Sequence, residues 1–231
     1  MLHAIKHNKI NRALFRGNED SLTSSVFERL LYLPKELMHH ILVKSIYQAI
    51  PDIDLFQYKS LEFWPSWDAT ETSNSKRVEP DIFIRTANND IIIEAKRHDR
   101  NQQWETQWKN QIRAYKNEYS EDQKELIYIA LGGLHSTKAS EIECSGKKHI
   151  IYTCDWTNLL RAIKDVKNNL ESGYSLINSN QAVSRIIEDL MMCFSMYGFS
   201  IADWFDSFYK SRDIGFNNNS LTTLKTWKKS I

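Results

Sequence analysis

The 231-residue chain contains little cysteine and no excess of charge of either sign. Its three cysteines, Cys144, Cys154 and Cys193, show no C-x-x-C spacing, which argues against a disulfide framework or a zinc site. Reduced thiols of a cytoplasmic protein are the expectation. The formal net charge is +1, so any binding of nucleic acid must come from local clusters of lysine and arginine rather than from a general basic field.

Long apolar runs are also missing. No eighteen consecutive residues are apolar, and residues 1–20 contain no apolar segment of the signal-peptide kind. We therefore expect a soluble protein without a membrane partner. The sequence contains no G-x-G-x-x-G, Walker, G-x-S-x-G or H-E-x-x-H motif, so it does not indicate the functions that those motifs mark.

What is present indicates a globular α/β protein. The chain is 42% hydrophobic and 12% aromatic, and it is long enough for one domain with a substantial core. Apolar spacing predicts helices over 21–34, 35–49, 102–119, 156–170 and 179–210. Strands are predicted within 53–67 and over 81–85, 90–96, 125–133 and 149–156, with a loop over 67–77.

One stretch, "EPDIFIRTANNDIIIEAKRH", places charged residues at the ends of two strand-like runs. Side chains alternate along a strand, so Glu94 and Lys96 project to the same face. Pairing the two runs as a hairpin brings Asp81 beside Glu94. Two carboxylates and an ammonium then meet at one end of the sheet, where the carboxylates suit a hard Mg²⁺ ion. The alternative is an ordinary ion pair at the edge of a sheet.

The spacing of these residues resembles a known motif. Pro80-Asp81, followed thirteen residues later by Glu94-Ala95-Lys96, is similar to the signature of the PD-(D/E)XK nuclease superfamily. The resemblance covers roughly residues 15–160. It implies a restriction-endonuclease-like αβββαβ core with a mixed central sheet, and we place this core in residues 1–172, with a C-terminal helical extension over 173–231.

The resemblance also implies an activity. Asp81, Glu94 and the Ala95 carbonyl would hold Mg²⁺, which Mn²⁺ can replace, and Lys96 would orient the attacking water or stabilise the transition state. The expected reaction is hydrolysis of DNA phosphodiester bonds by an endonuclease of bacterial or phage defence, restriction or repair. The alternative is a catalytically degenerate nuclease fold that binds DNA or serves in an assembly. A sugar- or protein-directed hydrolase would leave Lys96 unexplained.

Glu19 is the third acidic residue expected at the site. On a helical wheel it lies between Val26 and Leu30, in the middle of the apolar face of the first helix. Members of the superfamily often carry an acid there, so Glu19 is assigned to catalysis and to the metal. A role at the helix N-terminus is the alternative, with Asp20 as a competing cap. Glu28 falls on the solvent side.

The helix after the lysine carries "QIRAY", which resembles the QxxxY motif of some branches of the superfamily. Gln111 and Tyr115 are four residues apart and share a helix face with Trp104, Trp108 and Tyr119. Gln111 is expected to hold the Lys96 ammonium, a phosphate oxygen or a metal-bound water. The alternative is an aromatic core with Gln111 at its margin.

Candidate contacts to DNA phosphates are Lys76, Arg77, Arg97 and Arg100, and Tyr115 completes the expected substrate-binding set. Solvated surface charge is the alternative for the basic residues. Beyond the core, a set of apolar and aromatic residues suggests a homodimer or a partner-docking surface, or else a cover for the sheet. The set comprises Met191, Met192, Phe194, Tyr197, Phe199, Trp204, Phe205 and Phe208.

Overall fold

The fold is taken from a computed structural model, which describes residues 18–51, 53, 55, 58–97, 101–122, 124–171 and 181–200. The chain divides into two compact units, Met1–Ser200 and Ile201–Ile231, and all described residues belong to the first.

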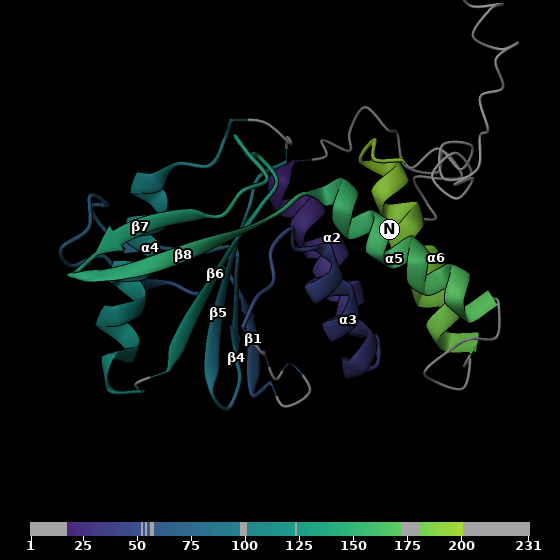
Figure 1. The fold of residues 1–231 in the computed structure, drawn as a ribbon, viewed down its shortest axis with the longest axis horizontal. Coiled ribbons are helices and arrows are strands. Elements are labelled where there is room, and N and C mark those ends of the chain that lie inside the picture. Colours follow the sequence, from purple (N-terminus) through teal and green to yellow (C-terminus); the bar gives the residue numbers. More distant parts are fainter. Residues whose placement is uncertain are drawn as a thin grey trace, which may run out of the picture. The chain divides into compact units, whose positions relative to one another are not determined.

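The centre of this unit is a six-stranded mixed sheet in the order β1-β4-β5-β6-β8-β7 (Figure 1). The strands are β1 (Ser60–Phe63), β4 (Ile82–Arg85), β5 (Asn89–Ala95), β6 (Glu125–Leu131), β7 (Ser140–Cys144) and β8 (Lys147–Cys154). β1, β4 and β5 are antiparallel, β5, β6 and β8 are parallel, and β7 is antiparallel to β8. The predicted α/β class with a mixed sheet is therefore confirmed.

Helices cover both faces of the sheet (Figure 1). They are α2 (Glu19–Leu30), α3 (Lys35–Ser45), α4 (Glu105–Tyr119), α5 (Trp156–Glu171) and α6 (Gln181–Met196). α4 lies on one side, and α2, α3, α5 and α6 lie on the other. α2 begins with a capping box between Asn18 and Ser21, so Asn18 is the cap and Asp20 is not.

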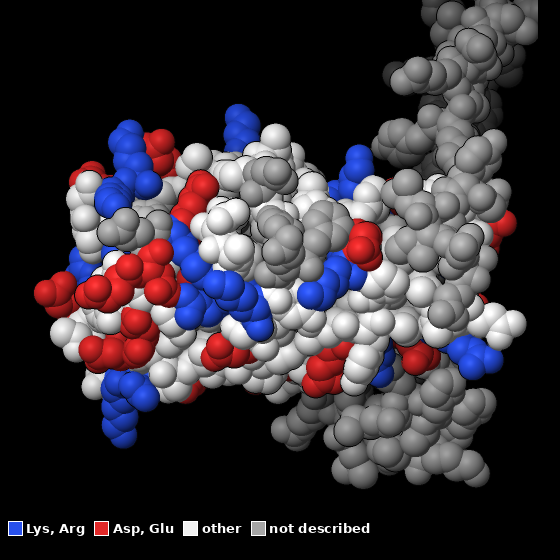
Figure 2. Space-filling model, turned by 90° about the horizontal axis from the view of Figure 1, so that it is seen from below, with Lys and Arg blue, Asp and Glu red and all other residues white. Residues whose placement is uncertain are grey.

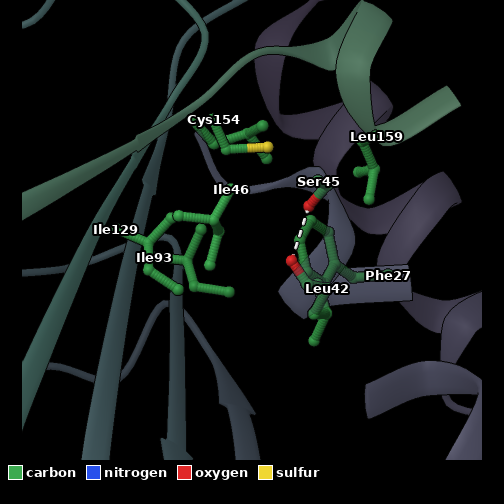
Figure 3. A pocket seen from close by; sticks show the side chains of 9 residues that line it. Phe27, Leu42, Ser45, Ile46, Ile93, Ile129, Cys154 and Leu159 are labelled. Atoms are coloured by element: carbon green, nitrogen blue, oxygen red, sulfur yellow. Dashed lines mark hydrogen bonds between the residues drawn. The ribbon is translucent and has the colours of Figure 1, made fainter. Parts of the chain in front are cut away.

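The α4 side of the sheet has an aromatic core. Trp67, Phe83 and Tyr115 pack edge to face, with Trp67 and Phe83 centroids 4.9 Å apart. The other side is apolar and almost fully packed. Its cavity is about 10 Å³ in volume and lies among side chains such as Phe27, Leu42 and Ile93 (Figure 3). A space of this size holds no more than about one water molecule, so this side is core and not a ligand site.

Several local predictions were wrong, including the helix over 179–210, because α6 ends at Met196. The 67–77 segment is not only loop, because β2 (Trp67–Asp68) pairs with β3 (Arg77–Val78). β7 was missed since its charged, alternating sequence is that of an exposed edge strand. The helix predicted to residue 49 ends at Ser45, where Ile46 turns extended and bridges to Cys154.

The C-terminal part of the unit is packed as core. α6 lies against α2 and α5, and the rings of Phe194 and Phe199 pack on Trp156. Phe194 and Tyr197 are buried, so they are not free for a partner. The compact unit ends at Ser200, and the predicted limit of the core at residue 172 stays a prediction. Trp204, Phe205 and Phe208 lie outside the described residues.

Two further findings concern the setting of the protein. Cys144, Cys154 and Cys193 are all buried, and within the described residues none of them forms a disulfide. Within the part of the chain that the structure describes, no helix is long and apolar enough to cross a membrane.

Candidate active site

The pairing of β4 with β5 fixes the position of the two carboxylates. Ile82 pairs with Ile93, so Asp81 and Glu94 follow as neighbours at the same end of the hairpin. Asp81 Oδ2 accepts a 2.7 Å hydrogen bond from the Ala95 N–H, which holds the carboxylate against the end of β5. Asp81 is 7% exposed and Glu94 is 2% exposed. The structure thus brings together the two acids of the expected motif.

Lys96 joins two acidic side chains at this end of the sheet. Its Nζ lies 2.5 Å from Glu94 Oε1 and 3.2 Å from Glu19 Oε1. Glu19 Oε2 accepts a 3.0 Å hydrogen bond from the Arg97 N–H, so the start of α2 is tied to the end of β5. Glu19 therefore belongs to the cluster through Lys96, and Glu28 is exposed as expected.

Three glutamines from α4 and the residues before it hold Glu94. Gln111 Nε2 donates to Glu94 Oε2 at 2.6 Å, and Gln107 Nε2 donates to Oε1 at 2.5 Å. Gln103 Nε2 donates to the Glu94 carbonyl at 3.0 Å. Gln111 also accepts a hydrogen bond from the Tyr128 hydroxyl. The expectation that Gln111 holds Lys96 needs correction, because its amide holds the Glu94 carboxylate.

Gln103 and Gln107 were missed by the sequence interpretation. A signal was available, because Gln103, Gln107 and Gln111 recur every four residues, the spacing that aligns side chains along one helix face.

Trp64 is a further site residue that the sequence did not indicate. Its indole Nε1 donates to Asp81 Oδ1 at 3.1 Å, and its backbone N–H donates to the Asp81 carbonyl at 3.1 Å. Trp64 has φ of 47°, a left-handed conformation that is unfavourable for a bulky residue. The two hydrogen bonds to Asp81 help to offset this strain.

The segment carrying Lys96 is fixed by a glycine pair and a tryptophan. Gly132 has φ of +69°, and a Cβ there would lie 2.2 Å from the Lys96 carbonyl oxygen. A Cβ on Gly133 would lie 2.6 Å from Lys96 Cβ. Trp156 Nε1 donates to the same Lys96 carbonyl at 2.7 Å. Only glycine permits this close approach of the loop after β6.

The cluster opens into a cleft of about 470 Å³, which is enough room for several water molecules and a phosphate group. The cleft is lined by Asp20, Trp64, Glu79, Asp81, Glu94, Lys96 and Gln107. An adjoining hollow shares Glu79 and Gln107 with it and reaches Trp104, which is 62% exposed. Both carboxylates of the pair are thus accessible from outside despite their burial.

Burial makes the charges in this cleft costly. It raises the pKa of Asp81 to about 7, and the neighbouring Glu94 carboxylate adds to the rise. Burial also raises the pKa of Glu94, although Lys96 and the Gln111 amide oppose the shift. Burial lowers the pKa of Lys96, but Glu94, Glu19 and Asp81 together outweigh this effect and raise it. One ammonium therefore compensates the acids only in part, and a further cation would be stabilised here.

The donor set fits an ion that prefers oxygen ligands and retains water. Within the described ranges, no group of three or more His, Cys, Asp or Glu side chains could hold a metal ion. Asp81 and Glu94 are two oxygen donors at the cleft, and Mg²⁺ is commonly held by one or two carboxylates plus waters. Glu19, the expected third acid of the metal site, binds the Lys96 ammonium and the Arg97 N–H through its two oxygens, and its role toward the metal stays a prediction.

The expected substrate contacts are distributed more widely. The Tyr115 hydroxyl donates to Asp90 Oδ2 at 3.1 Å, so Tyr115 belongs to the core near the far end of β5 and not to the cleft. Lys76 and Arg77 are exposed on and before β3. Arg97 is half-buried beside Glu19, and Arg100 lies outside the described residues.

The fold and the cluster define an α/β protein with a buried carboxylate–lysine site. No protein-family model matches the chain. The chain is 30% identical over 191 residues to uncharacterized protein PM0110 of Pasteurella multocida, and the match covers 79% of this chain and 70% of the relative. The chain belongs to the same protein family as PM0110.

Proposed function

We propose that this protein is a Mg²⁺-dependent deoxyribonuclease of the PD-(D/E)XK superfamily, an endonuclease of bacterial or phage defence, restriction or repair. The observation that carries the proposal is the arrangement of Asp81, Glu94 and Lys96. The carboxylates of Asp81 and Glu94 are buried at one end of two paired strands. The Lys96 ammonium lies 2.5 Å from Glu94, and all three side chains line an open cleft.

The order of the elements supports the same proposal. α2 precedes three antiparallel strands, β1, β4 and β5, and α4 then connects to β6, which is parallel to β5. This order agrees with the αβββαβ core expected for a restriction-endonuclease-like fold. The motif residues lie at the start of β4 and the end of β5, where that fold would carry its active site.

The chemistry would divide among these side chains. Asp81, Glu94 and the Ala95 carbonyl would hold Mg²⁺, which supplies a bound water of lowered pKa and neutralises charge on the scissile phosphate. Lys96 would orient the attacking water or stabilise the developing charge. Glu19 positions Lys96, while Gln107 and Gln111 fix the Glu94 carboxylate by hydrogen bonds of 2.5 and 2.6 Å. Trp64 fixes Asp81 in the same way.

A cleavage assay tests the proposal. Wild type should cut supercoiled, linear or branched DNA with Mg²⁺ and not with EDTA. Asp81→Asn should bind DNA without cutting, whereas Glu28→Gln, on the exposed face of α2, should cut like wild type. DNA binding without Mg²⁺-dependent cleavage by wild type would favour the alternative, a degenerate nuclease fold that acts in binding or assembly.

A further inference from the structure

The sheet has an opening between β6 and β8, at the end where both strands begin. These parallel strands pair only from Tyr128 and Ile151 onward, although β6 begins at Glu125 and β8 at Lys147. The two strands are therefore not paired with each other over residues 125–127 of β6 and 147–150 of β8, although each is paired with its other neighbour there. Figure 1 shows the two strands diverging toward their starts. We call this opening, between the starts of β6 and β8 and the end of α4, the notch.

The notch is large and separate from the carboxylate cleft. Its volume is about 580 Å³, within the range of small-molecule sites. Along the β5–β6 register, Asn89 pairs with Glu125 and Glu94 pairs with Ala130. Five residues of strand separate the two pairs, which corresponds to about 17 Å. A ligand in the notch would therefore leave the carboxylate cleft open.

Four lysines line the notch, and only two of them have an acidic partner in the described part of the chain. Lys124 Nζ lies 3.0 Å from Asp90, and Lys148 Nζ lies 2.6 Å from Glu141. Lys116 donates to the Cys144 carbonyl at 3.2 Å, and no carboxylate of the described residues lies within ion-pair distance of Lys116 or Lys147. The acid that lines the notch, Glu125, accepts from the Asn89 amide at 3.5 Å.

The half-buried imidazole of His149 has one shielded nitrogen atom without a hydrogen-bond partner among the described residues. His149 Nε2 has no hydrogen-bond partner among the described residues, although the atom is shielded from solvent. Burial lowers the pKa of His149, and the charges of Lys116 and Lys147 lower it further. Burial also lowers the pKa of Lys116. Cys144 opposes this shift, whereas the charges of Lys147 and Arg113 lower the pKa further. The basic groups of the notch thus repel one another, and an anion would relieve that repulsion.

We propose that the notch binds a phosphate group, with Lys116 and Lys147 supplying charge beside His149. A phosphate offers several acceptor oxygens to these separate donors, and lysine binds phosphate as a point charge. Seen from below, the molecule shows a run of basic side chains with acidic ones beside it (Figure 2). The phosphate could belong to a nucleic acid backbone or to a free nucleotide.

Calorimetric titration in EDTA distinguishes these two sources. The probes are ATP and a short DNA duplex, added to wild type and to Lys116→Gln/Lys147→Gln. The matched control is Lys44→Gln/Lys167→Gln, which removes equal charge from α3 and α5. We expect the notch variant to lose about tenfold or more in affinity for one probe, and the control to bind as wild type does. If the phosphate belongs to DNA, the slope of log K against log salt concentration should become less negative by about two in the notch variant.

The site predicted here does not depend on nuclease activity. The titrations are done in EDTA, where no Mg²⁺-dependent cleavage occurs, and the imidazole signals of His149 should shift in the NMR spectrum of wild type when the successful probe is added. Lys147→Gln alone, at an exposed position, should weaken binding even if the double variant folds poorly. The proposal is overturned if neither probe binds wild type, if both notch variants bind unchanged, or if the control loses as much affinity.

Discussion

Asp81 is the residue on which the account depends most, because its surroundings disfavour its charge. Burial and the Glu94 carboxylate raise its pKa to about 7, against a value of 3.8 in the absence of these effects. The acid is held in place by the Ala95 N–H and the Trp64 indole in spite of this cost. A destabilised carboxylate at an accessible cleft is typical of a functional site.

The pH dependence of stability follows from this shift. The folded protein keeps a proton that the unfolded chain releases between about pH 4 and pH 7, so the free energy of unfolding should fall as pH rises through that window. The limit for one proton is about 1.4 kcal/mol per pH unit. The raised pKa of Glu94 acts in the same direction.

Thermal melting in EDTA across this pH range checks the prediction. The melting temperature of wild type should decrease toward pH 7. The melting temperature of Asp81→Asn should depend less on pH and should be higher than that of wild type at pH 7. Glu28→Gln should follow wild type. A wild-type profile that rises over the same window would contradict the assigned environment of Asp81.

Gln111 is predicted to support both the fold and the metal site. Gln111→Ala leaves the buried Glu94 Oε2 and the Tyr128 hydroxyl without this partner, which should cost about 1–3 kcal/mol of stability. Mg²⁺ affinity should fall as well, because Glu94 is no longer oriented. Denaturant unfolding and Mg²⁺ titration measure the two effects.

Gln107→Ala is the matched comparison for Gln111→Ala. Gln107 bonds the same carboxylate from a less buried position, so its removal should cost less stability. If Gln111→Ala retained wild-type stability and Mg²⁺ affinity, Gln111 would have no role beyond the margin of the core.

At the scale of elements, the hairpin and the buried strand over 125–133 could be predicted from the sequence, but not that this strand is parallel to β5. Isoleucine runs and the short polar connection predicted β4 and β5 and put Asp81 beside Glu94. The QxxxY spacing was misleading, because its two ends serve different carboxylates: Gln111 bonds Glu94 and Tyr115 bonds Asp90. Sequence spacing fixes a shared helix face but not the partner across the sheet, which depends on how the helix packs.

Other elements left little signal. β2 and β3 are two residues each, too short for any periodicity, and they are stabilised by packing of Trp67 in the aromatic core. Trp64 faces Asp81 only because the chain turns through a left-handed conformation after β1. Such contacts arise from tertiary structure and have no local pattern.

The loop after β6 gives a prediction at this scale. Gly132→Ala would place a Cβ 2.2 Å from the Lys96 carbonyl oxygen, in addition to the strain of φ at +69°, and should cost about 3 kcal/mol or more. Gly146→Ala has a similar φ of +71° but no atom within 4 Å of its Cβ, and should cost about 1 kcal/mol. Denaturant unfolding of both variants measures the difference. Equal losses would contradict the close approach to Lys96.

For the whole molecule, the site raises the question of assembly. If the protein is the proposed nuclease, one site would cut one strand, and concerted cleavage of a duplex would need two sites related by symmetry. Phe194 and Tyr197, two of the C-terminal apolar and aromatic residues, are buried inside the unit. A dimer would therefore not form through these two side chains.

Analytical ultracentrifugation at micromolar concentration, with and without DNA, tests assembly. We expect a dimer, alone or on DNA, in any preparation that cuts both strands together. A monomer under both conditions that still makes concerted double-strand breaks would contradict this prediction.

The central claim is that Asp81 and Glu94 form a Mg²⁺ site, and the shift of the melting temperature on addition of Mg²⁺ at pH 8 tests it most directly. A ligand that binds only the folded state stabilises it, so wild type and Glu28→Gln should melt at higher temperature with Mg²⁺ than with EDTA. Asp81→Asn and Glu94→Gln should gain little. Equal gains in all four proteins, or no gain in wild type, would contradict the account.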